Sequence, residues 1–369
     1  MIKSISINNF RCYGNTTIEG FKRINLIGGL NNSGKTILLE ALLLSCSPTT
    51  ASISLLKQLR DNDSDIKELP EYAWSSFFLN QIIDKRIEIN TIYDDGKSIA
   101  IVMECNEKTD EFEQLDEKDL EETNDIQTIF NDFVIDERVL KSVLHIKYKN
   151  RIDAKEIPIL TLMAHKKGTT AKELNVPFTF ATYIPASMKR KSAILAREYG
   201  IAERKGKEKQ VLEALQIIDN NIETIRVSVI GGVHLEVKKK NGSFMPISLY
   251  GDAINRILNM ILSLINNGKK TVLLIDEIEN GIHYKNHQSF WRFLFQLASK
   301  EHFDVQIFAT THSIEMMEAF VKTSFEFPDE CAYIELYYRE LTNEIDYNIH
   351  NMSTLAFELS NKMAVRGEQ

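Results

Sequence analysis

A glycine-rich motif near the amino terminus constrains the fold of this chain more than any other feature. Residues 29–36 read Gly-Leu-Asn-Asn-Ser-Gly-Lys-Thr, a full match to the phosphate-binding pattern G-x-x-x-x-G-K-[ST]. The motif follows the mostly apolar run 24–27 and precedes the apolar segment 37–44, which is the strand–loop–helix context that confirms such a match. The sequence therefore predicts an α/β fold with a site for a nucleoside triphosphate at the start of a helix.

Each residue type in this motif has a role in holding phosphates. Gly29 and Gly34 allow the backbone to turn several N–H groups inward. Lys35 supplies a positive charge for the terminal phosphates and is a candidate catalytic residue, and the Thr36 hydroxyl is a candidate Mg²⁺ ligand. The other candidate nucleotide contacts in and beside the loop are Asn31, Asn32, Ser33 and Ile37.

A second motif predicts the metal-binding half of the same site. The apolar run 272–275 ends in two acids, of which Asp276 is the candidate Mg²⁺ ligand and Glu277 the candidate general base for the attacking water. Another strand-like run, 305–309, is followed by His312, a candidate contact to the γ-phosphate. Adjacent acids also occur at surface corners, and a histidine after a strand is often structural. Both assignments therefore depend on the phosphate loop in the same chain.

Composition is that of a globular protein in a reducing compartment. The 369 residues are 43% hydrophobic and 26% charged, and the net charge of −8 gives no overall positive field for nucleic acid. The four cysteines lie far apart and match neither a zinc motif nor a disulfide framework. We find no signal peptide and no run of roughly 20 apolar residues. We therefore expect a cytoplasmic chain with no membrane partner.

The last third of the sequence predicts alternating helices and buried strands. An amphipathic helix is expected over 251–266, where apolar residues recur at helical spacing. Another is expected around 290–297, between the buried strands 272–275 and 305–309. This alternation of strands and helices indicates an α/β architecture.

Earlier segments predict mainly strands and one charged helical region, 192–218. The first hairpin is expected to turn at Gly14-Asn15, and a second at residues 94–96. Strand-like segments elsewhere are 86–93, 99–103, 143–148, 157–162, 333–338 and 344–349. The segment 107–125 is crowded with acids and is expected to be peripheral to catalysis.

These motifs together resemble an ABC-type ATPase head, closest to the RecF/SMC-like branch that includes the overcoming-lysogenization-defect (OLD) ATPases. Residues 5–11, Ile-Ser-Ile-Asn-Asn-Phe-Arg, resemble the opening strand of that branch. The phosphate loop, residues 276–283 and residues 310–313 are also typical of it. The resemblance implies a P-loop NTPase fold, an ABC-type ATPase head with an antiparallel β subdomain and an inserted α/β lobe. It also implies hydrolysis of ATP with Mg²⁺.

The same resemblance implies a division of the chain. The stretch from Thr36 to Asp276 is far longer than one βα unit, so a lobe must be inserted into the ATPase core. We expect residues 1–60 and 181–369 to form the core and residues 61–180 to form the inserted lobe. No Toprim nuclease domain like that of the OLD proteins is expected.

By resemblance, residues 248–252 look like the ABC signature, Ser-Leu-Tyr-Gly-Asp. In the family, the serine and the following helix reach the γ-phosphate bound by another subunit, which implies roles for Ser248 and Gly251. Ala253 stands where related signatures often carry glycine, so this motif departs from the pattern. The implied active unit is a homodimer or larger assembly with ATP at its interface.

Two further implications concern the surroundings of the nucleotide. Residues 279–283 correspond to the D-loop at the dimer interface, and Phe10 or Arg11 is expected near the base or the phosphates. No glutamine can be assigned to the Q-loop.

The expected function is control of a separately encoded effector, such as a nuclease or toxin, by an ATPase that assembles around ATP. Resemblance to the ATPase subunits of bacterial anti-phage systems such as PARIS and Septu supports this expectation. The alternative is a RecF-like DNA-maintenance ATPase that binds double-stranded DNA through the basic runs 189–191, 204–207 and 238–240. A scaffold gated by nucleotide is a third reading, which Glu277 argues against. The sequence contains neither the base-reading motif of a GTPase nor a motif of a self-contained nuclease.

Replacing Lys35 by alanine is expected to remove most nucleotide affinity, because the triphosphate loses the cation that the motif supplies. Calorimetric titration with Mg–ATP measures this effect. Lys97→Ala, at the predicted turn near residues 94–96, is the control and should bind as the wild type does. Equal affinity of the Lys35 variant and the wild type would refute the assignment of the loop.

Overall fold

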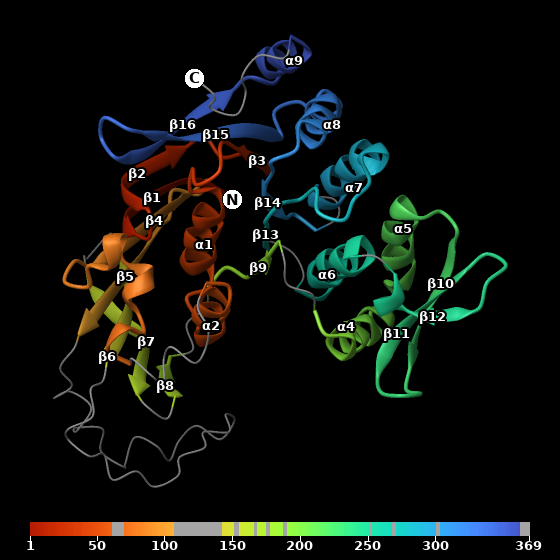
Figure 1. Ribbon diagram of the computed structural model, residues 1–369, viewed down its shortest axis with the longest axis horizontal. Helices are drawn as coiled ribbons and strands as arrows, with labels where there is room; N and C mark the ends of the chain where they lie inside the picture. The colour runs from red at the N-terminus through yellow and green to blue at the C-terminus, as the bar shows by residue number, and fades with distance from the viewer. Residues whose placement is uncertain are drawn as a thin grey trace, which may run out of the picture.

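The computed structural model describes most of the chain, namely residues 1–60, 70–106, 142–150, 155–165, 168–174, 178–186, 190–250, 252–267, 271–299 and 303–361. Its named strands form three sheets of six, seven and three strands (Figure 1). The acidic segment 107–125 lies outside the described residues.

The six-stranded sheet carries the nucleotide motifs. Its order is β16-β15-β3-β14-β13-β9, and all neighbours pair in parallel except β16, which is antiparallel to β15. The strands are β3 (Ile24–Gly28), β9 (Ala181–Ile184), β13 (Val272–Ile275), β14 (Gln306–Thr310), β15 (Cys331–Arg339) and β16 (Glu344–His350). Because β3, β13 and β14 are buried on both faces, they read as nearly continuous apolar runs, as predicted.

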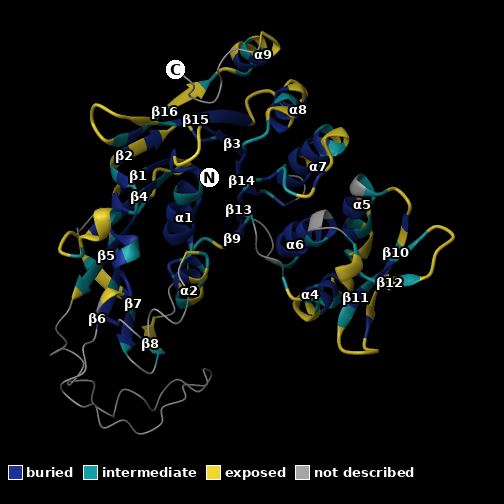
Figure 2. Ribbon diagram, in the orientation of Figure 1, coloured by how far each residue is buried: buried dark blue, intermediate teal, exposed yellow. Residues whose placement is uncertain are grey.

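Helices cover both faces of this sheet, as the mixed α/β prediction required. Helix α1 (Lys35–Cys46) packs on one face, and it is mostly buried (Figure 2). The other face is covered by α6 (Asp252–Asn267), α7 (His287–Ala298) and α8 (Ile314–Ser324), with α9 (Met352–Ser360) beyond them. Alternate residues divide between the two layers: on β13, Leu274 packs on the α1 side and Leu273 on the α6 side.

The seven-stranded sheet is antiparallel throughout, in the order β2-β1-β4-β5-β6-β7-β8. Its strands are β1 (Ile2–Phe10), β2 (Tyr13–Glu19), β4 (Ile87–Tyr93), β5 (Ser98–Asn106), β6 (Ser142–Asn150), β7 (Glu156–His165) and β8 (Gly168–Glu173). Strands of the expected inserted lobe thus continue the sheet that β1 and β2 begin. The division of the chain into core and lobe stays a prediction.

The first hairpin turns earlier than expected. The predicted turn at Gly14-Asn15 is wrong, because both residues lie within β2 and the turn is formed by Arg11 and Cys12. Phe10 pairs with Tyr13, and burial of both aromatic side chains sets this register. Arg11 adopts the left-handed conformation with φ 51°, which lets two residues close the turn.

The charged region 192–218 is helical, as predicted, and consists of two helices. Helix α4 (Ser192–Arg204) ends before Gly206, whose φ is +65°, and α5 (Glu208–Ile218) follows. A three-stranded sheet comes next, formed by β10 (Ile222–Ser228), β11 (His234–Lys239) and β12 (Phe244–Pro246) (Figure 1). The sequence did not predict these short strands because charged residues interrupt their apolar pattern. In the described part of the chain, none of the helices combines the length and the apolar character that a membrane span needs.

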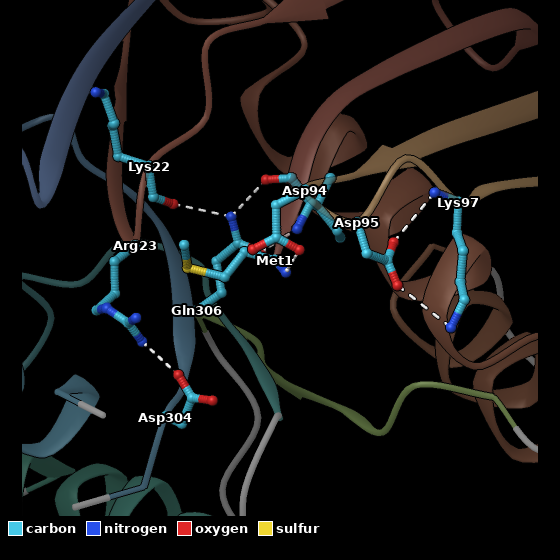
Figure 3. Close-up of polar contacts among 9 residues, drawn as sticks. Met1, Lys22, Arg23, Asp94, Asp95, Lys97, Asp304 and Gln306 are labelled. Atoms are coloured by element: carbon cyan, nitrogen blue, oxygen red, sulfur yellow. Dashed lines mark hydrogen bonds and ion pairs between the residues drawn. The ribbon is translucent and has the colours of Figure 1, made fainter. Parts of the chain in front are cut away.

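Polar contacts lock the amino ends of the central strands together (Figure 3). Arg23, 4% exposed, binds Asp304 at 2.9 Å and Glu330 at 2.8 Å. The Gln306 side chain donates to the Ile2 carbonyl at 2.8 Å and accepts from the Ile2 N–H at 2.7 Å. These contacts join β1, β3 and β14 at the end of the sheet opposite the phosphate loop.

His350 is expected to make stability depend on pH. Its hydrogen bond to Glu335 (2.8 Å), with the charges of Glu335 and Glu358, raises the pKa of the imidazole above its ordinary value against the opposing effect of burial. The stabilisation is therefore complete below about pH 6.5 and is lost as pH rises through the raised pKa. Chemical denaturation of wild type and His350→Gln should show a larger difference at about pH 6, below the ordinary pKa of histidine, than at about pH 9. An equal difference at both would contradict the role of His350.

Candidate nucleotide-binding site

The phosphate loop is shaped by its two motif glycines. Gly29 has φ +133°, and a Cβ there would lie 2.1 Å from the carbonyl oxygen of Leu336 on β15. Gly34 has φ +87° and is the N-cap of α1, where no side chain caps the first turn. Glycine is therefore the residue that suits both positions. The uncapped N–H groups at the start of α1 are available to an anion bound inside the loop.

Lys35 lies back across the loop. Its side chain is 5% exposed, and Nζ donates to the carbonyl oxygens of Gly29 at 2.8 Å and Leu30 at 2.6 Å. The ammonium group is therefore held beside the loop backbone, within the segment expected to surround the phosphates. Of the other loop candidates, Ser33 is buried, Ile37 is half-buried, and Asn31 and Asn32 are exposed.

Asp276 is the residue that joins the two predicted halves of the site. Its carboxylate accepts from the Thr36 hydroxyl at 3.0 Å and from the Thr310 hydroxyl at 2.7 Å. The side chain is 6% exposed, and burial raises its pKa, while the hydrogen bonds from Thr310 and Thr36 act in the opposite direction. The sequence motifs at β3 and β13 thus meet at the carboxyl edge of the sheet, as their positions predicted.

The oxygen atoms of Thr36 and Asp276 fit a magnesium site. A hydroxyl and a carboxylate are the hard donors that Mg²⁺ prefers, and the ion usually takes its other ligands from phosphates and water. Among the described residues no group of three or more histidine, cysteine or acidic side chains could form a closed metal cage. The residues therefore suit an ion that binds together with a nucleotide.

Glu277 is held in an unusual backbone conformation at the end of β13. Its φ is 48°, in the left-handed region that a non-glycine residue rarely adopts. Its N–H donates to the Thr310 hydroxyl at 2.8 Å, and Asn280 Nδ2 donates to its carboxylate at 2.6 Å. The candidate base is therefore oriented through both its backbone and its side chain.

His312 follows β14 and lies among the charges of the site. Its N–H donates to Glu279 Oε1 at 2.7 Å. Burial lowers the pKa of the His312 ring and the positive charge of Lys35 lowers it further, against the opposing effect of three carboxylates, Glu279, Glu277 and Asp276. The lowered pKa favours the neutral ring, whose N–H could donate a hydrogen bond to a phosphate oxygen. Glu279 was expected at the dimer interface, and its bond to the His312 backbone was not foreseen.

The remaining candidates come from elements other than the phosphate loop. Arg11 pairs with the buried Glu40 of α1 at 2.6 Å and lies over the Phe77 ring, while Phe10 is buried. Ser248 is exposed in a 3₁₀ turn before α6, and no contact of the described residues joins it to the phosphate loop. Gly251 lies outside the described residues.

Two residues in contact with the acidic motif were missed as site residues. Asn280 and Arg256 both bind Glu277, Asn280 at the carboxylate and Arg256 at the backbone carbonyl. Asn280 lies only three residues beyond Glu277, so its proximity was a usable signal. Arg256 lies on a distant helix, outside the apolar stripe that marked that helix, and gave no signal.

Known proteins are similar to this chain over the phosphate loop, the acidic pair and His312. A family model described as "AAA domain, putative AbiEii toxin, Type IV TA system" matches residues 24–318, from β3 into α8. A Helicobacter pylori (strain ATCC 700392 / 26695) protein named "ATP/GTP phosphatase" is 24% identical over 329 residues, which are 86% of this chain and 87% of that protein.

Thr310 is expected to matter because one hydroxyl serves both acids, donating to Asp276 and accepting from the Glu277 N–H. Thr310→Val removes both bonds and should cost about 1–3 kcal/mol of stability and at least about tenfold in ATP turnover. Thr310→Ser keeps the hydroxyl and is the matched control. Chemical denaturation and phosphate release measure the two effects. Identical behaviour of the valine and serine variants would exclude this role.

Proposed function

We propose that this chain, which belongs to the AAA-domain family whose model matches residues 24–318 and is an ATPase of that family, assembles around ATP. In bacterial anti-phage defence it would control a separately encoded effector, such as a nuclease or toxin. The finer resemblance to the RecF/SMC-like, OLD-related branch is part of this proposal.

The observation that carries hydrolysis is the hydrogen-bonded network from Thr36 through Asp276 to Thr310, with Glu277 beside it. Lys35 would contact the terminal phosphates, and Thr36 with Asp276 would hold Mg²⁺. The ion, when bound, neutralises phosphate charge. Glu277, oriented by Asn280, would take the proton of the attacking water.

Completion of the site by a second copy is supported by the position of Ser248. The serine is exposed and precedes α6, whose N-terminal dipole favours negative charge. Large apolar side chains in or next to the segments expected at the interface are exposed: Leu30 is 44% exposed, Leu249 68%, and Tyr284, directly after residues 279–283, 60%. Such side chains would be covered when two copies enclose the nucleotide.

The proposed role in defence rests on the description of the matching family and on the residues of the described site. The family description names an AbiEii toxin of a type IV system. The residues that meet at the described site are those of nucleotide hydrolysis. We assign the nucleotide-dependent control to this chain and the damaging activity to a separate protein.

Contacts of three lysines in the basic runs favour this function over a DNA-maintenance role. Lys238 pairs with Glu223 at 2.9 Å and Lys239 with Asp219 at 2.6 Å. Lys205 Nζ donates at 2.8 Å to the carbonyl of Asn266, near the end of α6. These lysines are thus engaged within the protein, whereas binding to DNA would use basic groups directed at phosphates.

Glu277→Gln is expected to slow ATP turnover by roughly two to four orders of magnitude, because the amide cannot accept the proton of water. Mg–ATP should bind and persist, so light scattering should show ATP-stabilised assembly. Ser248→Arg in the same background should weaken the assembly, while Ser243→Arg, an exposed serine between β11 and β12, should not. If both the wild type and Glu277→Gln stay monomeric under saturating Mg–ATP, the shared site is ruled out.

Control of an effector is tested by expressing the chain with and without the product of the adjacent gene. Growth inhibition or phage protection that requires both proteins and intact Glu277 supports the proposal. Stimulation of ATP turnover by double-stranded DNA, without any partner, would favour the RecF-like alternative.

A further inference from the structure

Arg256 on helix α6 binds the backbone at the ends of two neighbouring parallel strands, the edge strand β9 and β13. Nη1 donates to the carbonyl oxygens of Pro185 at 2.9 Å and Ala186 at 3.0 Å, directly after β9. Nη2 donates to those of Asp276 at 2.8 Å and Glu277 at 3.1 Å, directly after β13. One planar guanidinium therefore joins α6 to both strand ends beside the candidate base.

This arginine is buried without a direct ion pair to any described residue. Its side chain is 6% exposed, and burial lowers the pKa of the guanidinium, while the charges of nearby acids, Asp276, Glu277 and Glu279, oppose that shift. Burying a cation is costly unless its donors are satisfied. Here four backbone carbonyls accept from the two Nη groups, while Nε has no hydrogen-bond partner among the described residues. The Nη contacts offset much of that cost and define the position of α6 relative to these carbonyls.

The backbone of Glu277 requires such support. A non-glycine residue at φ 48° stays there only when its surroundings determine it. Thr310 holds the N–H of Glu277, Asn280 holds its carboxylate, and Arg256 holds its carbonyl. The first two groups belong to the edge of the sheet, whereas Arg256 belongs to the helix that follows Ser248.

We infer that Arg256 is a positioning residue for ATP hydrolysis, which fixes the backbone of Glu277 and makes the placement of the base depend on helix α6. The inference rests on the proposed function, because it takes Glu277 as the base. Arg256 acts through Glu277 and does not itself contact the nucleotide. A change in the position of α6, the helix that Ser248 would bring to a second copy, is thereby transmitted to the base.

The chemistry of the side chain makes lysine a poor replacement. Four acceptors from two chain segments match the planar fork of arginine, whereas an ammonium group is a single point of charge. Misplacement of a catalytic group by about 1 Å can cost about a hundredfold in rate. Both Arg256→Gln and Arg256→Lys should therefore slow turnover by roughly 10- to 100-fold, with ATP affinity within about threefold of wild type.

A double-mutant comparison separates positioning from general damage. If Arg256 acts through Glu277, then Arg256→Gln should cause no further loss of turnover in the Glu277→Gln background. The matched control is Arg23→Gln, which removes another buried arginine that donates to a backbone carbonyl, that of Ala298, at the opposite end of the sheet (Figure 3). The control should lose stability but keep the turnover of the folded fraction.

Hydrogen exchange gives a readout that needs no hydrolysis. Without nucleotide, Arg256→Gln should speed exchange in peptides that cover residues 276–278, because their backbone loses an anchor. If wild type fails to hydrolyse ATP, the proposed function is wrong, and the exchange result still decides the role of Arg256. Wild-type exchange in the variant, turnover within about threefold of wild type, or a full multiplicative loss with Glu277→Gln would overturn the inference. Should the glutamine variant not fold, Arg256→Lys is measured in the same way.

Discussion

The shared hydrogen bonds of the Asp276 carboxylate are the contact on which the rest of the site depends. Thr36 lies in the first turn of the helix after β3, Thr310 ends β14, and Asp276 follows β13. Strand β14 lies between the other two in the sheet, so the carboxylate can reach both hydroxyls only while the parallel register of three strands is kept. The apolar layers on both faces of the sheet stabilise that register. Folding of the core and assembly of the metal-binding oxygens are thus one event.

The antiparallel hairpins outside the family match also shape the phosphate loop. The Tyr13 hydroxyl donates to the Gly34 carbonyl at 3.2 Å, and the Ile345 side chain of β16 lies where a Cβ on Gly34 would be. The Leu336 carbonyl of β15 occupies the corresponding space at Gly29. The loop is therefore enclosed by backbone and side chains from two hairpins. This close packing explains why the motif requires glycine here for space as well as for positive φ.

Sequence reasoning succeeded where a local pattern determines position. Parallel strands end at a common edge, so apolar runs followed by Lys35, Asp276 and His312 predicted a single site. It failed where tertiary contacts decide: the turn at Arg11 follows from the buried pair of Phe10 and Tyr13, and the three-stranded sheet has little apolar pattern of its own. Arg256 could not be found because its partners are backbone carbonyls, which leave no mark in the sequence. The role of Ser248 stays a prediction because it concerns a second copy.

Helix α6 connects Ser248, expected at the interface with a second copy, to the backbone of the candidate base. Its amino end follows Ser248, which is exposed toward solvent, while Arg256 one turn inside the helix grips the backbone of the candidate base. A helix is stiff over this length, so a force on its amino end moves Arg256 with it. The strained conformation of Glu277 makes it sensitive to movement of Arg256. A residue in a sparsely populated backbone region shifts when one of its supporting contacts is lost. Assembly and hydrolysis would then be coupled mechanically within each chain, without a separate regulatory domain.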